Sequence, residues 1–334
     1  MFGKLNRPCP SKSSRVGRLN SLLFQPVIPE NITNFKGRVV AAYGRQYEVR
    51  LDGDYPGSTV LMCTPRGKKS LYVCGDEVEV EAADVTQGVI IELFPRRSIF
   101  YRADTFKEKL IASNVTQVVM VAATEPGFSD ELLTRCLCAV DSQKLSGLIV
   151  LNKCDLKTHL HRGRELLAPL VRLGYPVIEL SAKDDNLDDF RQRLSGHISL
   201  LVGQSGMGKT TLINALVPGA DARTGIVSDA LKSGKHTTTH SRWYDLPGGG
   251  ALIDSPGLQA FGLAHLTREQ IEKGFREFEP LFGQCRFRDC QHDREPQCAF
   301  RAALVAGAID ARRFKIFQSL LIEKRGKRDH FPPS

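Results

Sequence analysis

The residues best suited to chemistry form one short run: Gly203, Gln204, Ser205, Gly206, Met207, Gly208, Lys209 and Thr210. The run fits G-x-x-x-x-G-K-[ST], the phosphate-binding P-loop, in which glycines let successive backbone N–H groups point at phosphate oxygens. Lys209 would add a positive charge for the β- and γ-phosphates, and the Thr210 hydroxyl would ligate Mg²⁺. The alternative is a glycine-rich turn without a ligand. Both flanks favour the P-loop, because residues 197–202 are typical of a strand and Thr211 opens a helical pattern over 211–216.

Two further motifs follow predicted strands and could recognise a base. Asn152, Lys153, Cys154 and Asp155 fit N-K-x-D. Asp155 can accept hydrogen bonds from N1–H and the 2-amino group of guanine, and adenine offers neither donor in that place. The second motif is Ser181, Ala182 and Lys183, whose backbone could donate to guanine O6. Because ligands bind at the carboxyl ends of such strands, the two motifs and the P-loop together predict a site for GTP or GDP.

The chain after the P-loop contains two candidate phosphate sensors. Residues 235–240 read K-H-T-T-T-H. We expect one threonine there to reach Mg²⁺ and the γ-phosphate, and Thr238 is our candidate, although the sequence does not distinguish it from Thr237 or Thr239. A surface loop with chance threonines is the alternative. A predicted hairpin then ends in D-S-P-G, where Asp254 would hold Mg²⁺ through water and the Gly257 amide would sense the γ-phosphate.

These are the motifs of a GTPase in a permuted order. The guanine motifs at 152–155 and 181–183 precede the P-loop, whereas in the usual order they follow it. The sheet can be the same if the old termini are joined and the chain is cut after D-x-x-G. The segment 254–262 then leads directly into the C-terminal part. A change there on loss of the γ-phosphate could be transmitted to that part.

A cluster near the C-terminus has the residue types of a structural zinc site. Cys285, Cys290, His292 and Cys298 are spaced C-x4-C-x-H-x5-C, and three thiolates with one imidazole make a closed tetrahedral set. The surrounding segment is rich in charge, and such a segment cannot build an apolar core without a staple. The alternative is a set of reduced, unrelated cysteines.

Composition limits the class of protein and its partners. The chain has 334 residues, ordinary hydrophobic and charged fractions, and a net charge of +9. No apolar run reaches the roughly 18 residues of a membrane span, and no secretory signal is recognisable. Basic residues gather at the two ends, which is typical of arms that bind nucleic acid. Nine cysteines, an odd number, argue against a disulfide framework. We therefore expect a cytoplasmic protein with no membrane partner, and a monomer.

The elements that must position these residues divide the chain into four parts. Residues 1–34 are expected to be a disordered basic arm, and 35–97 contain five short strands that suit an OB-type β-barrel or an SH3-like barrel. In residues 98–263 strands and helices alternate, which predicts a circularly permuted P-loop α/β GTPase domain with a mostly parallel sheet. Residues 264–334 form a mostly helical zinc-binding part with a basic tail. Its expected helices cover 267–279, 299–308 and 310–324.

The set of motifs in this order resembles the bacterial ribosome small subunit-dependent GTPase A family, the circularly permuted GTPases of 30S assembly. The resemblance covers about residues 35–300, with mild departures at Ser255, Met207 and Thr210. It implies GTP hydrolysis stimulated by the 30S subunit, a role in its late maturation, and release of the protein after hydrolysis. It also implies contacts of the barrel and zinc parts with 16S rRNA.

The water-positioning group for hydrolysis stays open. Leu258 follows D-x-x-G, where a Ras-type GTPase has glutamine, so we expect slow intrinsic hydrolysis. Our hypothesis is that His236 supplies the group once the ribosome orders its loop, with Gln259 and a ribosomal group as rivals. A GTP-switched RNA-binding adaptor with incidental hydrolysis is the second reading of the chain. A P-loop kinase or ATPase is the third, and Asn152 and Asp155 argue against it.

Overall fold

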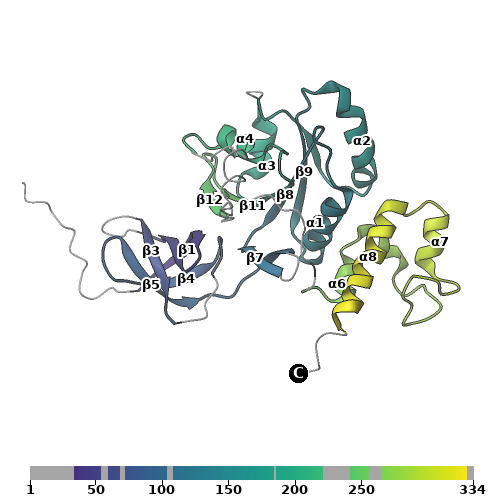
Figure 1. Ribbon diagram of the computed structural model, residues 1–334, viewed down its shortest axis with the longest axis horizontal. Coiled ribbons are helices and arrows are strands. Elements are labelled where there is room, and N and C mark those ends of the chain that lie inside the picture. Colours follow the sequence, from purple (N-terminus) through teal and green to yellow (C-terminus); the bar gives the residue numbers. More distant parts are fainter. Residues whose placement is uncertain are drawn as a thin grey trace, which may run out of the picture.

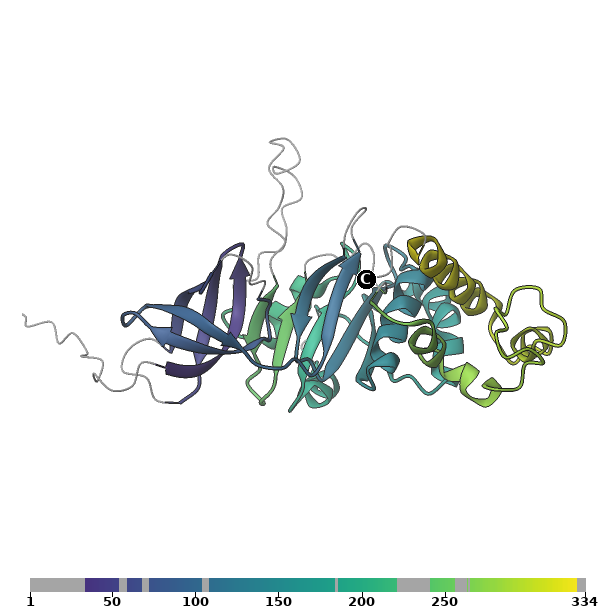
Figure 2. The ribbon, with the colours of Figure 1, turned by 90° about the horizontal axis from the view of Figure 1, so that it is seen from below.

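Three parts of the molecule lie in a row. Figures 1 and 2 show a small β-barrel at one end, a twisted sheet covered by helices in the middle, and a helical module at the other end. The predicted basic arm before residue 34, His236, Thr238 and Gly257 lie outside the residues that are described. The computed structural model describes residues 34–53, 59–67, 72–103, 108–183, 186–220, 241–255, 263 and 265–328.

The barrel is of the OB type. Its strands are β1 (Asn34–Tyr43), β2 (Gln46–Leu51), β3 (Val60–Pro65), β4 (Glu77–Ala82) and β5 (Gln87–Leu93). β1 pairs with β2 and β4, β2 with β3, β3 with β5 in parallel, and β5 with β4, so the sheet closes on itself. Alternate side chains point inward and fill a core of their own. This strand order decides between the two barrels that the sequence allowed.

A buried carboxylate fastens the barrel to the chain that follows it. Asp76 is fully buried just before β4. Its carboxylate accepts hydrogen bonds from the Val73 amide at 2.8 Å, from Nε and Nη2 of Arg96 at 2.7 Å each, and from Ser113 Oγ at 2.6 Å. A buried charge is tolerated only when it is paired and hydrogen-bonded as here. Asp76 therefore joins the barrel, the linker after β5 and strand β7 (Glu108–Ser113).

The barrel also pairs with the edge of the middle sheet. β12 (Arg242–Asp245) runs antiparallel to β1, with Arg242 opposite Ala41. The guanidinium groups of Arg38 and Arg50 lie over the ring of Trp243, 5.1 and 5.6 Å from its centroid. Arg50 also pairs with Asp245. Strand pairing and cation–π contacts thus merge the barrel and the middle sheet into one eleven-stranded sheet.

The middle sheet is parallel except at this edge. Its strands are β8 (Gln117–Ala123), β9 (Ser146–Asn152), β10 (Val177–Glu179), β11 (Ile198–Val202) and β13 (Ala251–Asp254). The order is β10-β9-β8-β11-β13-β12, and only β12 is antiparallel. The chain runs outward from β8 to β10 and then crosses back to β11, so the strand order reverses between β8 and β11. Ligands bind at such a switch point. A short hairpin of β6 (Ile99–Ala103) and β7, which the sequence analysis did not assign, precedes the sheet.

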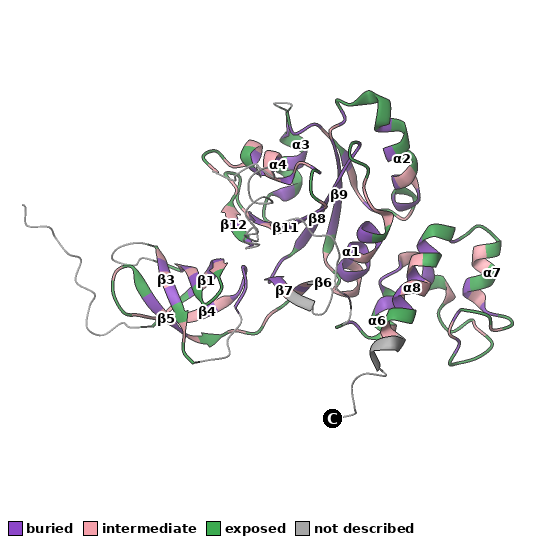
Figure 3. Cartoon of the chain, viewed as in Figure 1, coloured by how far each residue is buried: buried purple, intermediate pink, exposed green. Residues whose placement is uncertain are grey.

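Helices cover both faces of the sheet, and strand alternation supplies the two cores. Val118 and Met120 of β8 face the core shared with α1 (Asp130–Ser142) and α2 (Lys157–Arg172), whereas Val119 and Val121 face the core of α3 and α4. The bounds of the latter two helices are Asp188–Leu194 and Lys209–Leu216. Figure 3 shows the strands between these layers as almost continuously buried. Ser129 caps α1, since its side chain accepts a hydrogen bond from the Leu132 amide.

The C-terminal module packs on α1. Its elements are α6 (Arg268–Lys273), the 3₁₀ turn η1 (Arg276–Leu281), α7 (Ala299–Val305) and α8 (Ala311–Arg328). The helix expected over 267–279 ends at Lys273 with Gly274 as its C-cap, because glycine is a poor helix former. Gly274 also lies directly against α1, where a Cβ atom would be 2.5 Å from Cys138 Sγ. The buried aromatic core of the module is continuous with the α1 core of the sheet. Within the described part of the chain, no helix has both the length and the apolar character needed to cross a membrane.

The barrel attachment gives a matched pair of substitutions. Gly75 and Gly67 have left-handed φ values of 98° and 100°, so an Ala at either costs about 1 kcal/mol of stability. A Cβ at Gly75 would also lie 2.1 Å from the Ser113 carbonyl oxygen, whereas a Cβ at Gly67 meets no atom of the described residues within 4 Å. We expect Gly75→Ala to lower the free energy of unfolding by at least about 2 kcal/mol more than Gly67→Ala. Equal denaturation midpoints for the two variants would contradict this account of the attachment.

Candidate functional site

The predicted nucleotide motifs meet at the carboxyl edge of the parallel sheet. N-K-x-D follows β9, S-A-K follows β10, the P-loop follows β11 and Asp254 ends β13. Figure 1 shows β8, β9 and β11 in the middle sheet, whose strand order brings together segments that are far apart in the chain. These segments contain Asn152, Lys153, Asp155, Ser181, Ala182, Lys183, Gly203–Thr211 and Asp254.

Asn152 ties three of these loops together. It is 1% exposed, and its Nδ2 donates to the Met207 carbonyl of the P-loop at 2.8 Å. Its Oδ1 accepts from the amides of Lys153 at 2.8 Å and Ala182 at 3.0 Å. Gly208 has φ 90° and lies so close that a Cβ there would be 2.3 Å from Asn152 Nδ2. The glycine is therefore required both by its backbone conformation and by the approach of the amide.

The loop at 152–155 is held in place by two residues that the sequence analysis missed, Thr124 and Glu125. Lys153 has φ 63°, and its Nζ donates to the Glu125 carbonyl at 2.7 Å. Thr124 Oγ1 donates to the Lys153 carbonyl at 2.9 Å. Both Thr124 and Glu125 follow β8 directly, and that position at a strand end was the available signal. The loop leaves the Asp155 side chain exposed, as recognition of an incoming base requires.

The P-loop lysine is buried within its own loop. Lys209 is 8% exposed, and its Nζ donates to the carbonyls of Gly203 at 2.7 Å and Gln204 at 3.1 Å. Burial lowers the pKa of Lys209, and the charge of Asp254 acts in the opposite direction. Gln204 Oε1 accepts from the Ser129 amide at 2.9 Å, which fixes the loop to the start of α1. A desolvated cation at a helix N-terminus is suited to hold phosphate oxygens.

Asp254 has the features of a carboxylate that receives a cation. Its Oδ1 is buried and has no hydrogen-bond partner among the residues described. An unpaired buried oxygen is costly, so this atom fits a Mg²⁺-bound water or the ion itself. Burial raises the pKa of Asp254, and the positive charge of Lys209 opposes that rise. Thr210, half-buried in the first turn of α4, is the second predicted ligand on the same edge.

Ser255 fills the place where the family pattern has threonine. It is fully buried, and its Oγ donates to the Leu201 carbonyl of β11 at 2.7 Å. Threonine could make the same bond, so the departure noted in the sequence leaves the β11–β13 pairing intact at Asp254.

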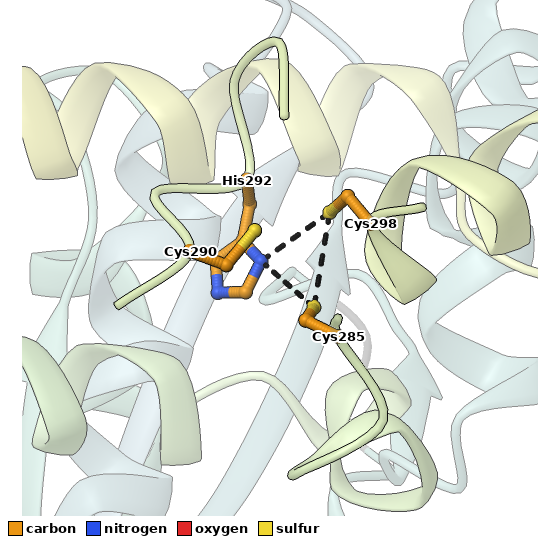
Figure 4. A group of neighbouring side chains, drawn as sticks. All are labelled: Cys285, Cys290, His292 and Cys298. Carbon is orange, nitrogen blue, oxygen red and sulfur yellow. Dashed lines mark hydrogen bonds between the residues drawn. The ribbon is translucent and has the colours of Figure 1, made fainter. Parts of the chain in front are cut away.

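The zinc set is assembled in the C-terminal module. The ligand atoms of Cys285, Cys290, His292 and Cys298 all lie within 4.8 Å of one another. Figure 4 shows His292 Nδ1 facing two sulfurs, with Cys285 Sγ at 3.6 Å and Cys298 Sγ at 3.5 Å, and the two sulfurs 3.9 Å apart. Ligands about 2.1–2.3 Å from a tetrahedral Zn²⁺ would be separated by roughly 3.6–3.8 Å. The donor set and its spacing therefore fit one structural Zn²⁺.

The fold and the site define a class. A parallel sheet carrying a P-loop, a guanine motif and a buried D-x-x-G carboxylate is that of a P-loop GTPase, here in circularly permuted order. The model of the RsgA GTPase family matches residues 93–264. Small ribosomal subunit biogenesis GTPase RsgA of Burkholderia pseudomallei is 50% identical over 291 residues, covering 86% of this chain and 92% of that protein. The protein of the same name from Nitrosomonas europaea is 47% identical over 292 residues, covering 86% and 91%. The chain belongs to the RsgA GTPase family and is a GTP hydrolase.

Solved structures agree with this fold. YjeQ from Thermotoga maritima has a TM-score of 0.67 and 28% identity, covering 88% of this chain and 99% of that chain. YloQ, described as a circularly permuted GTPase, has a TM-score of 0.63 at 22% identity, covering 90% and 97%. The second likeness bears on the fold alone. The expected architecture of OB-type barrel, permuted GTPase domain and C-terminal module with a possible zinc site is confirmed.

The unpaired oxygen of Asp254 leads to a testable contrast. Asp254→Asn should reduce Mg²⁺-dependent GTP hydrolysis at least about 100-fold, since a cation contributes several kcal/mol there. The nucleotide-free variant should unfold at the same temperature as the parent or higher, because the change removes a desolvated charge. Because burial raises the pKa of Asp254, protons should also compete with Mg²⁺ at higher pH than at an exposed carboxylate.

The control is Asp188→Asn, which makes the same change at an exposed position on α3. It should leave hydrolysis unchanged. A hydrolysis rate of Asp254→Asn equal to that of the parent would show that Asp254 does not hold Mg²⁺.

Proposed function

We propose that this GTPase binds the small (30S) ribosomal subunit, assists its late maturation, hydrolyses GTP on stimulation by the subunit, and then dissociates. The observation that carries the proposal is the likeness to a protein named small ribosomal subunit biogenesis GTPase, which covers 86% of this chain and 92% of that protein. A bacterial factor of this kind works in the cytoplasm. We propose that it acts there as a monomer.

The residues at the sheet edge divide the work on GTP. Asp155 accepts the two guanine donors, and the backbone of the S-A-K motif, residues 181–183, donates to O6. Lys209 and the amides that begin α4 hold the phosphates, while Thr210 and Asp254 hold Mg²⁺. The ion, when bound, neutralises charge that develops between the β- and γ-phosphates. Leu258 in the glutamine position makes intrinsic hydrolysis slow, which leaves the rate open to control by the subunit.

The barrel and the C-terminal module supply contacts with 16S rRNA. They lie on opposite sides of the GTPase domain, so one molecule can touch two separated RNA segments (Figure 2). The net charge of +9 gives affinity for phosphate, and its salt dependence follows from counterion release. One structural Zn²⁺ on Cys285, Cys290, His292 and Cys298 holds the loop 285–298 in shape for its contact. In the adaptor alternative, the same RNA contacts are made but the subunit does not change the hydrolysis rate.

Base selectivity tests the guanine site directly. Asp155→Asn replaces an acceptor by an amide that can donate, and xanthine has a carbonyl where guanine has its 2-amino group. We expect the affinity for GDP to fall about 100-fold, and that for xanthosine diphosphate to rise, in a fluorescence-analogue competition assay. ADP should compete weakly with both proteins. Displacement by ADP as effective as by GDP in the parent protein would show that the guanine assignment is wrong.

Stimulation by the subunit tests the function and the proposed role of His236 together. Purified 30S subunits should raise the GTPase rate of the parent protein at least about tenfold when both rates are measured at the same salt concentration. His236→Ala should bind GTP normally and lose that stimulation. His240→Ala, an imidazole in the same K-H-T-T-T-H run, serves as the control and should keep it. Full stimulation of His236→Ala would favour Gln259 or a ribosomal group. A parent rate that 30S subunits leave unchanged would support the adaptor alternative.

A further inference from the structure

The two ring nitrogens of His292 face different groups. Nδ1 faces the sulfurs of Cys285 and Cys298, as Figure 4 shows. Nε2 lies 3.5 Å from Oε1 of Glu272, a residue of α6 that is outside the predicted zinc set. The imidazole therefore stands between the metal cluster and a carboxylate, with one nitrogen toward each.

The carboxylate of Glu272 is itself held in place. Arg268 Nε donates to Glu272 Oε1 at 2.7 Å, and Arg268 Nη2 donates to the carbonyl of Cys290. The side chains of Glu272 and Arg268 are only 17% and 22% exposed. Arg268 thus connects the carboxylate to the backbone of a second metal-ligand residue, so the pair is built into the cluster and is not a surface ion pair.

Other contacts fix the plane of the His292 ring but do not decide which edge of the ring faces the sulfurs. Phe300 stacks on the imidazole with centroids 3.8 Å apart and an angle of 25° between the planes. Gln318 Nε2 donates to the His292 carbonyl at 3.3 Å, and the backbone of His292 has φ 59°. A stacked ring can still flip about its Cβ–Cγ bond, which would present a carbon instead of Nδ1 to the sulfurs. The two orientations differ in the contacts of Nδ1 with the sulfurs and in the contact of Nε2 with Glu272, and the latter does not depend on a bound metal.

We propose that Glu272 is a positioning residue of the metal centre, accepting the Nε2–H proton of His292 in a hydrogen bond so that the Nδ1 lone pair faces Zn²⁺. A carboxylate in this place fixes the tautomer and makes the imidazole a stronger ligand. The inference rests on the zinc occupancy proposed above. It adds α6 to the metal centre, and α6 also contacts the GTPase domain, since Cys138 Sγ of α1 donates to the Ile271 carbonyl at 3.7 Å.

Zinc affinity, measured by competition with a chromophoric chelator on the full chain, tests the role. Glu272→Ala should bind Zn²⁺ roughly 10–100-fold more weakly than the parent. Glu272→Gln should fall between them, because its amide oxygen can still accept from Nε2–H but carries no charge. Glu269→Ala and Glu269→Gln are the matched controls, since Glu269 is exposed on the same helix, and they should bind as the parent does.

Two further readouts separate positioning from a merely structural contribution. Nitrogen-15 NMR of the zinc-loaded parent should show His292 protonated at Nε2, and Glu272→Ala should shift that signal. The loss of stability in Glu272→Gln should be larger in the zinc-loaded than in the metal-free protein, by the amount that the affinity ratio predicts.

Equal zinc affinity of the parent and both Glu272 variants would overturn the inference, as would an equal loss of stability with and without metal. A parent protein that takes up no Zn²⁺ at all would instead overturn the zinc site on which the inference rests. If Glu272→Ala does not fold, Glu272→Gln carries the test, because it keeps the shape and the acceptor.

Discussion

The buried amide of Asn152 is the constraint on which the nucleotide site depends. It donates a hydrogen bond to the P-loop carbonyl of Met207 and accepts hydrogen bonds from the amides of Lys153 and Ala182. Three loops that leave different strands are thereby held at one spacing before any ligand arrives. An amide can do this because it offers donors and an acceptor on one rigid plane, which a carboxylate cannot. Binding energy for the base then does not have to be used to assemble the site.

The same preorganisation explains why the permuted chain keeps an ordinary nucleotide site. Strand order in space, not order along the chain, decides which carboxyl ends meet. β11 lies between β8 and β13, so the P-loop adjoins both the guanine side and Asp254 wherever the chain begins. Cutting the chain after D-x-x-G changes only which part follows Asp254. The permutation therefore leaves the nucleotide site unchanged and alters only which part of the chain follows it.

Much of this could be predicted from the sequence because the motifs have fixed relations to strand ends. The P-loop, Asn152 and the zinc residues were identifiable from type and spacing alone, and the structure brings each set together. Pairings between distant segments carry no such local signal. Asp76 and Trp243 read as ordinary residues of predicted strands, and Glu272 as an ordinary residue of a predicted helix. Their roles come from what the tertiary fold places opposite them. The helix expected to run to residue 279 ends early at Gly274, a local stop signal that the sequence contained.

The contacts show how Asp254 is connected to the C-terminal module and to the barrel. The sequence suggested a connection to the C-terminal module, because it follows D-x-x-G. That module contacts α1 through the bidentate contact of Arg276 with Asp141, and α1 packs on one face of the sheet. On the other side, Asp254 pairs with Arg242, and Arg242 pairs with Ala41 of the barrel, in one row across three strands. Strand pairing thus connects β13 with the barrel, and a shared buried core connects α1 with the module. Covalent continuity leads from Asp254 to the module, whereas strand pairing leads from Asp254 to the barrel.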